Sequence, residues 1–154
     1  MGVLYIVVPL TDEVTGWLEK LGINYPNQCS SRNPFGSEIV STLDGLTQLS
    51  IEYSGEAIGS NWQATVCSKQ DPARGPWTLL NIRSFKEFDA ENEICFEKGH
   101  PNLIVEILHR LTQSTGPLVL VPDTGEDPLV IQPTLSPESM LSSWEHMNET
   151  DFKE

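Results

Sequence analysis

The sequence predicts an α+β fold, in which two to four helices pack on one face of a mainly antiparallel sheet of four to six strands. Several short segments alternate apolar and polar residues, which is typical of antiparallel strands with one buried face. Other, longer segments place apolar residues at helical spacing. The predicted strands are grouped between the helices instead of alternating with them, which favours α+β over α/β.

The chain begins with an apolar, β-branched segment, Val3–Val8, which predicts a buried central strand. No basic segment precedes it, so we expect a strand and not a secretory signal. A helix is predicted next, with Thr11 as a suitable N-cap and Gly22 as its end. Its apolar face consists of Val14, Trp17, Leu18 and Leu21.

The middle of the chain predicts a loop, a short helix and a run of strands. The loop covers 24–36, where polar residues are mixed with Pro and Gly. Residues 37–46 keep helical spacing, although their β-branched residues leave a strand open as the alternative. Strands are then predicted at 49–53, 62–66, 77–82 and 93–97. We expect Trp17, Trp62 and Trp77 to be core residues.

The strongest helix prediction covers Pro101–Ser114. His100 occupies the capping position, and Pro101 is the first helical residue, where its missing N–H is not needed. The predicted buried stripe consists of Leu103, Ile104, Ile107, Leu108 and Leu111.

A hairpin with strands at 118–121 and 129–131 is predicted to follow, and Ser136-Pro137 begins a last helix. The domain prediction is one α+β domain over 1–135, with a C-terminal helix and a frayed acidic tail over 136–154.

The charge is strongly negative. The chain has 22 Asp and Glu against 9 Lys and Arg, a net charge of −13. From Asp123 onward, eight acidic residues face one basic residue, Lys153. This charge repels phosphate groups, so nucleic acid and membrane surfaces are not expected partners, whereas a basic protein is. The predicted partner-binding residues are Asp123, Glu126 and Asp127, which crowd one turn; the alternative is that the charge serves solubility alone.

Asp123-Thr124-Gly125, within Val119–Ile131, resembles the active-site segment of retroviral-type aspartic proteases. The resemblance implies that two such aspartates, one from each subunit, share a proton and activate water. The segment departs from that pattern at Pro122, where the family has an apolar strand residue. Pro, Asp and Gly are also the residues expected in a hairpin turn, so we predict a turn at this position and no catalytic residue.

The sequence predicts no metal site and no cofactor. Its histidines show no metal-ligand spacing. The three cysteines, Cys29, Cys67 and Cys95, lie far apart and form no Cys-x-x-Cys pair. An odd number of separated cysteines favours a reducing compartment, so we expect a cytoplasmic protein.

These observations favour a non-enzymatic protein-interaction domain. In composition the chain resembles bacterial immunity proteins, which implies an inhibitor that masks a basic partner such as a toxin. One alternative is a hydrolase or transferase whose site assembles from scattered residues such as Asp123, Asp127 and His100. Another is a structural subunit of a larger assembly.

Overall fold

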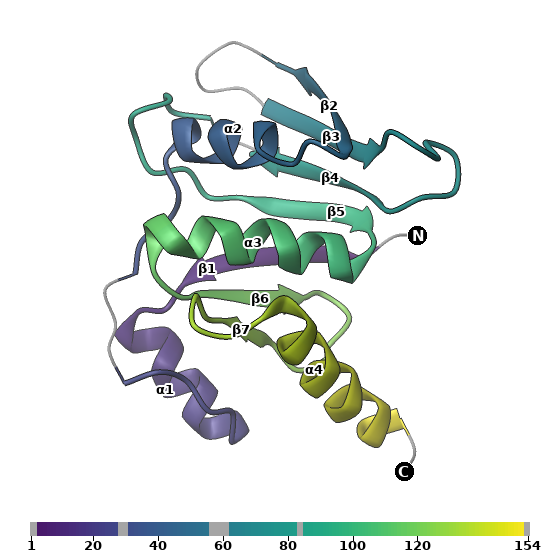
Figure 1. Cartoon of the computed structure of the whole chain (residues 1–154). Coiled ribbons are helices and arrows are strands. Elements are labelled where there is room, and N and C mark those ends of the chain that lie inside the picture. The colour runs from purple at the N-terminus through teal and green to yellow at the C-terminus, as the bar shows by residue number, and fades with distance from the viewer. Residues whose placement is uncertain (1–2, 28–30, 56–61, 83–84, 153–154) are drawn as a thin grey trace.

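The structure is a computed structural model that describes residues 3–27, 31–55, 62–82 and 85–152, with side chains up to Trp144 (Figure 1). Its elements, in chain order, are β1 (Leu4–Pro9), α1 (Asp12–Leu21), α2 (Gly36–Asp44), β2 (Leu49–Ser54), β3 (Trp62–Ser68), β4 (Trp77–Ile82), β5 (Cys95–Gly99), α3 (Pro101–Thr115), β6 (Leu118–Pro122), β7 (Leu129–Ile131) and α4 (Pro137–Phe152).

The strands form one antiparallel sheet in the order β2-β3-β4-β5-β1-β6-β7. The predicted α+β class with an antiparallel sheet is therefore confirmed. The predicted number of four to six strands is wrong, because the sheet has seven. β1 pairs with β5 along one edge and with β6 along the other, so the first strand joins the β6–β7 hairpin to the central strands.

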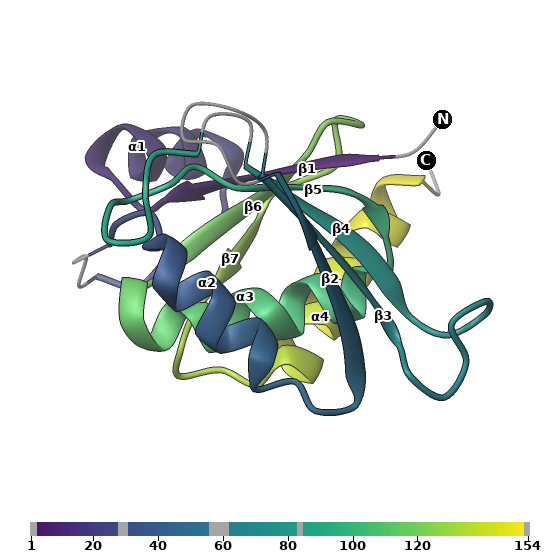
Figure 2. The same cartoon turned by 90° about the horizontal axis from the view of Figure 1, so that it is seen from above.

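Three helices cover one face of the sheet. Figure 2 shows α3 across its middle, with α2 and α4 on either side. The predicted stripe of α3 is buried, and it packs on Phe96, Leu80 and Tyr5 of the sheet. α4 adds Met140 and Trp144 to the same core.

The prediction that all helices lie on one face is wrong, because α1 packs on the opposite face (Figure 2). There, Leu18 of α1 and Leu10 pack against Val119 and Val130 of the β6–β7 hairpin. β1 is apolar on both sides, so this end of the sheet is covered by helices on both faces.

Residues 36–44 form the helix α2, as the apolar spacing predicted, and Ile39 and Leu43 are buried. β5 begins at Cys95, two residues after the predicted start. None of the described helices combines the length and apolarity needed to cross a membrane.

Candidate interaction surface

The predicted acidic residues lie on the turn that connects β6 to β7, and the turn is joined to the start of β1. The backbone N–H of Asp123 donates to the carbonyl of Leu4 at 2.9 Å. The N–H of Leu4 donates in return to the Asp123 carboxylate at 3.1 Å. Gly125 has a φ of 88°, the left-handed conformation that favours glycine in a turn. The structure thus places Asp123 in a turn.

Two further contacts fix the same turn. The Thr124 hydroxyl donates to the Glu126 carboxylate at 2.9 Å. The indole N–H of Trp144, on α4, donates to the backbone carbonyl of Asp127 at 2.7 Å. Asp123 is exposed, whereas Glu126 and Asp127 are half-buried. β1 and α4 therefore hold the turn from two sides.

The buried Tyr5 lies close to this acidic turn, and the sequence analysis did not single it out. Burial raises the pKa of its phenol, and the negative charges of Glu126 and Asp123 raise it further. The phenol is therefore neutral at physiological pH. Tyr5 stands opposite Pro122 in the register of β1 and β6, one residue from the turn, so only that pairing brings it there.

The acidic turn is at one end of the molecule. Figures 1 and 2 both show the β6–β7 connection, the beginning of β1 and the end of α4 on the same side. The acidic turn, the beginning of β1 and the end of α4 therefore lie near the same end of the fold.

The third residue of the scattered-site alternative, His100, is engaged with β4. It is the N-cap residue of α3, as predicted, but its side chain makes no capping hydrogen bond. Its backbone N–H donates to the carbonyl of Trp77 at 3.0 Å, and its Nδ1 accepts from the Trp77 N–H at 3.2 Å. This nitrogen has a structural partner in the backbone of the neighbouring strand.

The cysteines supply no metal site in the described part of the chain. Cys95 is buried and Cys67 is half-buried, while Cys29 lies outside the described residues. Within 3–27, 31–55, 62–82 and 85–152, no three His, Cys, Asp or Glu side chains are grouped as metal ligands.

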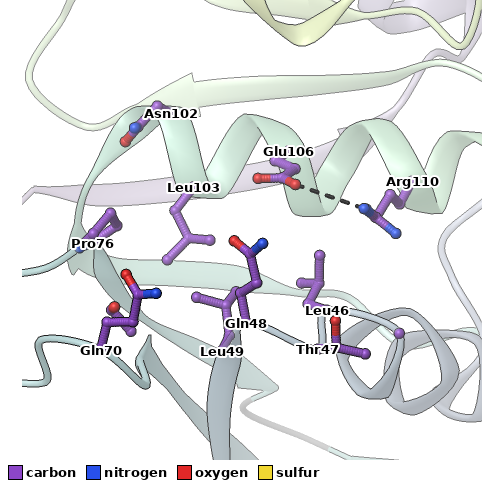
Figure 3. Close-up of a pocket in the computed structure, with 12 residues that line it drawn as sticks. Leu46, Thr47, Gln48, Leu49, Gln70, Pro76, Asn102, Leu103, Glu106 and Arg110 are labelled. Carbon is purple, nitrogen blue, oxygen red and sulfur yellow. Dashed lines mark ion pairs between the residues drawn. The ribbon is translucent and has the colours of Figure 1, made fainter.

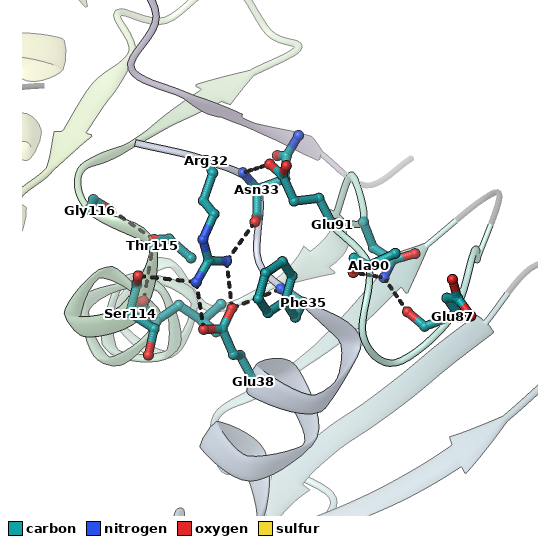
Figure 4. A network of polar contacts seen from close by, with 12 residues as sticks. Arg32, Asn33, Phe35, Glu38, Glu87, Ala90, Glu91, Ser114, Thr115 and Gly116 are labelled. Carbon is teal, nitrogen blue, oxygen red and sulfur yellow. Dashed lines mark hydrogen bonds and ion pairs between the residues drawn. The ribbon is translucent and has the colours of Figure 1, made fainter. Parts of the chain in front are cut away.

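A polar network around Arg32 joins the start of α2 to the end of α3 (Figure 4). The guanidinium donates to both oxygens of the Glu38 carboxylate at 2.8 Å, and to the carbonyl of Ser114 at 3.3 Å. It also lies 3.9 Å from the centre of the Phe35 ring. The hydrogen bond from Arg32 is the largest cause of a lowered pKa at Glu38. The hydrogen-bonding groups of Arg32 and Glu38 are therefore paired with each other and with nearby backbone, which indicates a structural role for this network.

A cleft of about 370 Å³ lies between the α2–β2 connection and α3 (Figure 3). Its polar lining includes Gln48, Gln70 and Asn102. Glu106 and Arg110 form an ion pair across 3.7 Å at its edge, and about half of each side chain is exposed. None of its lining residues, all of them described, is a histidine or a cysteine. The cleft could hold a small polar molecule, but it has no nucleophile with an adjacent base.

Part of the sheet face on the α1 side is exposed. Ile6 of β1 is 42% exposed and Trp77 of β4 is 37% exposed. The expectation that Trp62 is a core residue is confirmed. For Trp77 and Trp17, which are both exposed, the same expectation is wrong.

Comparisons of the chain with protein-family models, with curated proteins and with solved structures found no significant match.

Proposed function

We propose that this chain is a non-enzymatic protein-interaction domain that binds a basic protein partner through the turn carrying Asp123, Glu126 and Asp127. The observation that carries the proposal is the fixed geometry of this turn. Hydrogen bonds to Leu4 and from Trp144 hold the turn, so these acidic residues cannot move far apart to relieve their mutual repulsion. A partner with clustered lysines or arginines would relieve that repulsion on binding.

The charge of the whole chain supports the same partner. Its net charge of −13 would attract a basic protein over long range and so speed the encounter. Two of the described arginines are engaged elsewhere, since Arg32 is paired with Glu38 and Arg110 with Glu106, both at the α2–α3 side of the fold.

The most specific form of the proposal is a cytoplasmic inhibitor of the immunity type. Such an inhibitor would lay its acidic turn over the basic site of a toxin and exclude that toxin's anionic substrate. The engagement of His100 with the Trp77 backbone and the hydrogen bond between Asp123 and Leu4 both favour binding over hydrolysis.

The test uses the protein encoded by the adjacent reading frame, since an inhibitor is commonly encoded beside its target, or otherwise a basic protein that co-purifies at low salt. The triple variant D123N/E126Q/D127N keeps each side-chain acceptor oxygen and removes three charges. The matched control, D12N/E13Q/E52Q, removes three exposed charges elsewhere.

We expect the first variant to slow association about tenfold and the control to slow it far less, as measured by stopped-flow kinetics. Raising salt from about 50 to about 500 mM shortens the Debye length from roughly 14 to roughly 4 Å, and should weaken the wild type more than the triple variant. An affinity that responds neither to salt nor to the triple change would contradict the proposal.

A separate assay addresses the protease alternative. Purified wild type and Asp123→Asn are incubated with unfolded casein at acidic pH, where an aspartic dyad would be active. We expect no hydrolysis that depends on Asp123. Cleavage by the wild type that disappears in the variant would establish the enzyme instead.

A further inference from the structure

A second cavity, of about 410 Å³, is lined mainly by four aromatic residues and is called here the aromatic pocket. The centres of neighbouring rings are 5.4 Å apart for Tyr53–Trp62, 5.7 Å for Trp62–Phe85 and 5.0 Å for Phe85–Phe88. Trp62 and Phe85 are buried, whereas Tyr53 is 39% and Phe88 48% exposed. Val40, on the middle of α2, completes the apolar lining.

The two residues with exposed rings, Tyr53 and Phe88, are hydrogen-bonded to opposite ends of α2. The Tyr53 hydroxyl donates to the carboxylate of Asp44, the last residue of α2, at 2.9 Å. At the other end of the helix, the N–H of Ser37 donates to the carbonyl of Phe88 at 2.9 Å. The Tyr53 ring and the backbone that carries Phe88 are thus fixed before any ligand arrives, which lowers the entropic cost of binding.

The glycine that begins α2 is part of this arrangement. A Cβ on Gly36 would lie 3.0 Å from the Phe88 Cα and 3.2 Å from the rings of both Phe85 and Phe88. The absence of a side chain lets this aromatic segment pack directly on the helix.

Among the described residues next to the aromatic pocket, acidic side chains outnumber basic ones. Asp44 is hydrogen-bonded to Tyr53, and Glu87 and Asp89 flank Phe88 in the sequence, where Lys86 is the basic neighbour; all four are exposed. Burial, together with Asp44, raises the pKa of Tyr53, so its ring stays a neutral phenol. One acidic residue, Asp44, is thus in direct contact with a ring of the pocket.

We propose that the aromatic pocket binds an alkylated ammonium cation. The faces and edges of several rings attract such a cation, which carries its charge inside an apolar shell. The nearby carboxylates add long-range attraction, which a neutral aromatic ligand would not use. The volume lies within the range of small-ligand pockets. The proposal does not depend on the acidic turn, which belongs to a different part of the fold.

The test compares choline with its uncharged isostere 3,3-dimethyl-1-butanol by calorimetric titration of the full chain. We expect choline to bind at least tenfold more tightly. Phe88→Leu keeps an apolar side chain but removes the ring, and should weaken choline at least tenfold, whereas Phe88→Tyr should retain it within about threefold. Trp77→Ala, at an exposed aromatic residue elsewhere, should leave the affinity unchanged.

Two peptides, one with trimethyllysine and one with lysine, distinguish the source of the cation. Tighter binding of the trimethylated peptide than of choline would identify a modified protein as the source, and the reverse order a free small molecule. Equal affinity for choline and its neutral isostere, no binding of either, or an unchanged affinity in Phe88→Leu would overturn the proposal.

Discussion

Asp123 and Leu4, 119 residues apart in the chain, close the β1–β6 ladder with two hydrogen bonds: the Leu4 N–H donates to the Asp123 carboxylate at 3.1 Å, and the Asp123 N–H donates to the Leu4 carbonyl at 2.9 Å. In one of these bonds a side-chain oxygen takes the place of a strand carbonyl. The first residue of the candidate surface is therefore also a structural residue, and its two roles can be separated by mutation.

Asp123→Ala should lower the free energy of unfolding by about 1 kcal/mol, because the Leu4 N–H loses its acceptor. Asp123→Asn keeps an acceptor oxygen and should change it by less than half as much. Urea unfolding followed by circular dichroism measures both. If the two variants lose equal stability, the charge of Asp123 matters and its hydrogen bond to Leu4 does not.

The Arg32–Glu38 pair predicts a pH dependence of stability. Hydrogen bonding from Arg32 lowers the pKa of Glu38 below its ordinary value of 4.5 in the folded state. The stability that this pair contributes is therefore fully present above about pH 4.5 and is lost as pH falls through the lowered pKa. Glu38→Gln should lower the stability by about 2 kcal/mol at pH 7.

The difference between the wild type and Glu38→Gln should shrink at acidic pH, where the wild-type carboxylate is itself protonated. Glu106→Gln is the control, because its pair with Arg110 is long, at 3.7 Å, and half exposed, and should contribute less than about 0.5 kcal/mol. A difference for Glu38→Gln that stays constant from pH 7 to pH 3 would contradict the linkage.

The sequence predicted the elements better than their arrangement. Periodicity identified the buried stripe of α3, and the length and composition of 3–8 identified the central strand β1, although Ile6 on its α1 side is exposed. The same pattern could not show which helix would cover which face of the sheet. Leu18 and Val119 are apolar in any case, and only the pairing of β1 with β6 brings them together on the side opposite α3.

Of the two candidate sites, one could be predicted from the sequence and the other could not. The acidic turn could be predicted because Asp123, Glu126 and Asp127 are neighbours in sequence. The aromatic pocket could not, since Tyr53 is a strand residue and Phe88 belongs to a link with no periodicity. Their proximity depends on the fold, in which α2 contacts both residues, Tyr53 through Asp44 and Phe88 through Ser37.

The buried stripe of α3 predicts a large loss of stability on introducing a charge. Ile107 is fully buried, so Ile107→Asp should lower the free energy of unfolding by several kcal/mol. Asn102→Asp adds a charge at an exposed position in the first turn of the same helix and should change it by less than about 0.5 kcal/mol. Thermal unfolding compares the two; similar melting temperatures would mean that the stripe is not core.

The backbone of Gly99 lies very close to β4, at the point where the β4–β5 register shifts. Its φ is 110°, and a Cβ there would lie 2.4 Å from the carbonyl oxygen of Trp77 and 2.6 Å from the Cβ of Thr78. The β4–β5 register shifts beside Thr78, so the two strands cannot separate locally without losing ladder hydrogen bonds. Gly99→Ala should therefore lower the free energy of unfolding by about 3 kcal/mol or more, from backbone strain and steric overlap together.

Gly125→Ala is the control that separates backbone strain from steric overlap, because Gly125 has a similar φ of 88° but nothing within 4 Å of its added Cβ. This control should lose only about 1 kcal/mol, the cost of the left-handed conformation alone. Urea unfolding of both variants measures the difference, and equal losses would mean that the sheet relaxes around residue 99 and that the close approach is not a constraint on the fold.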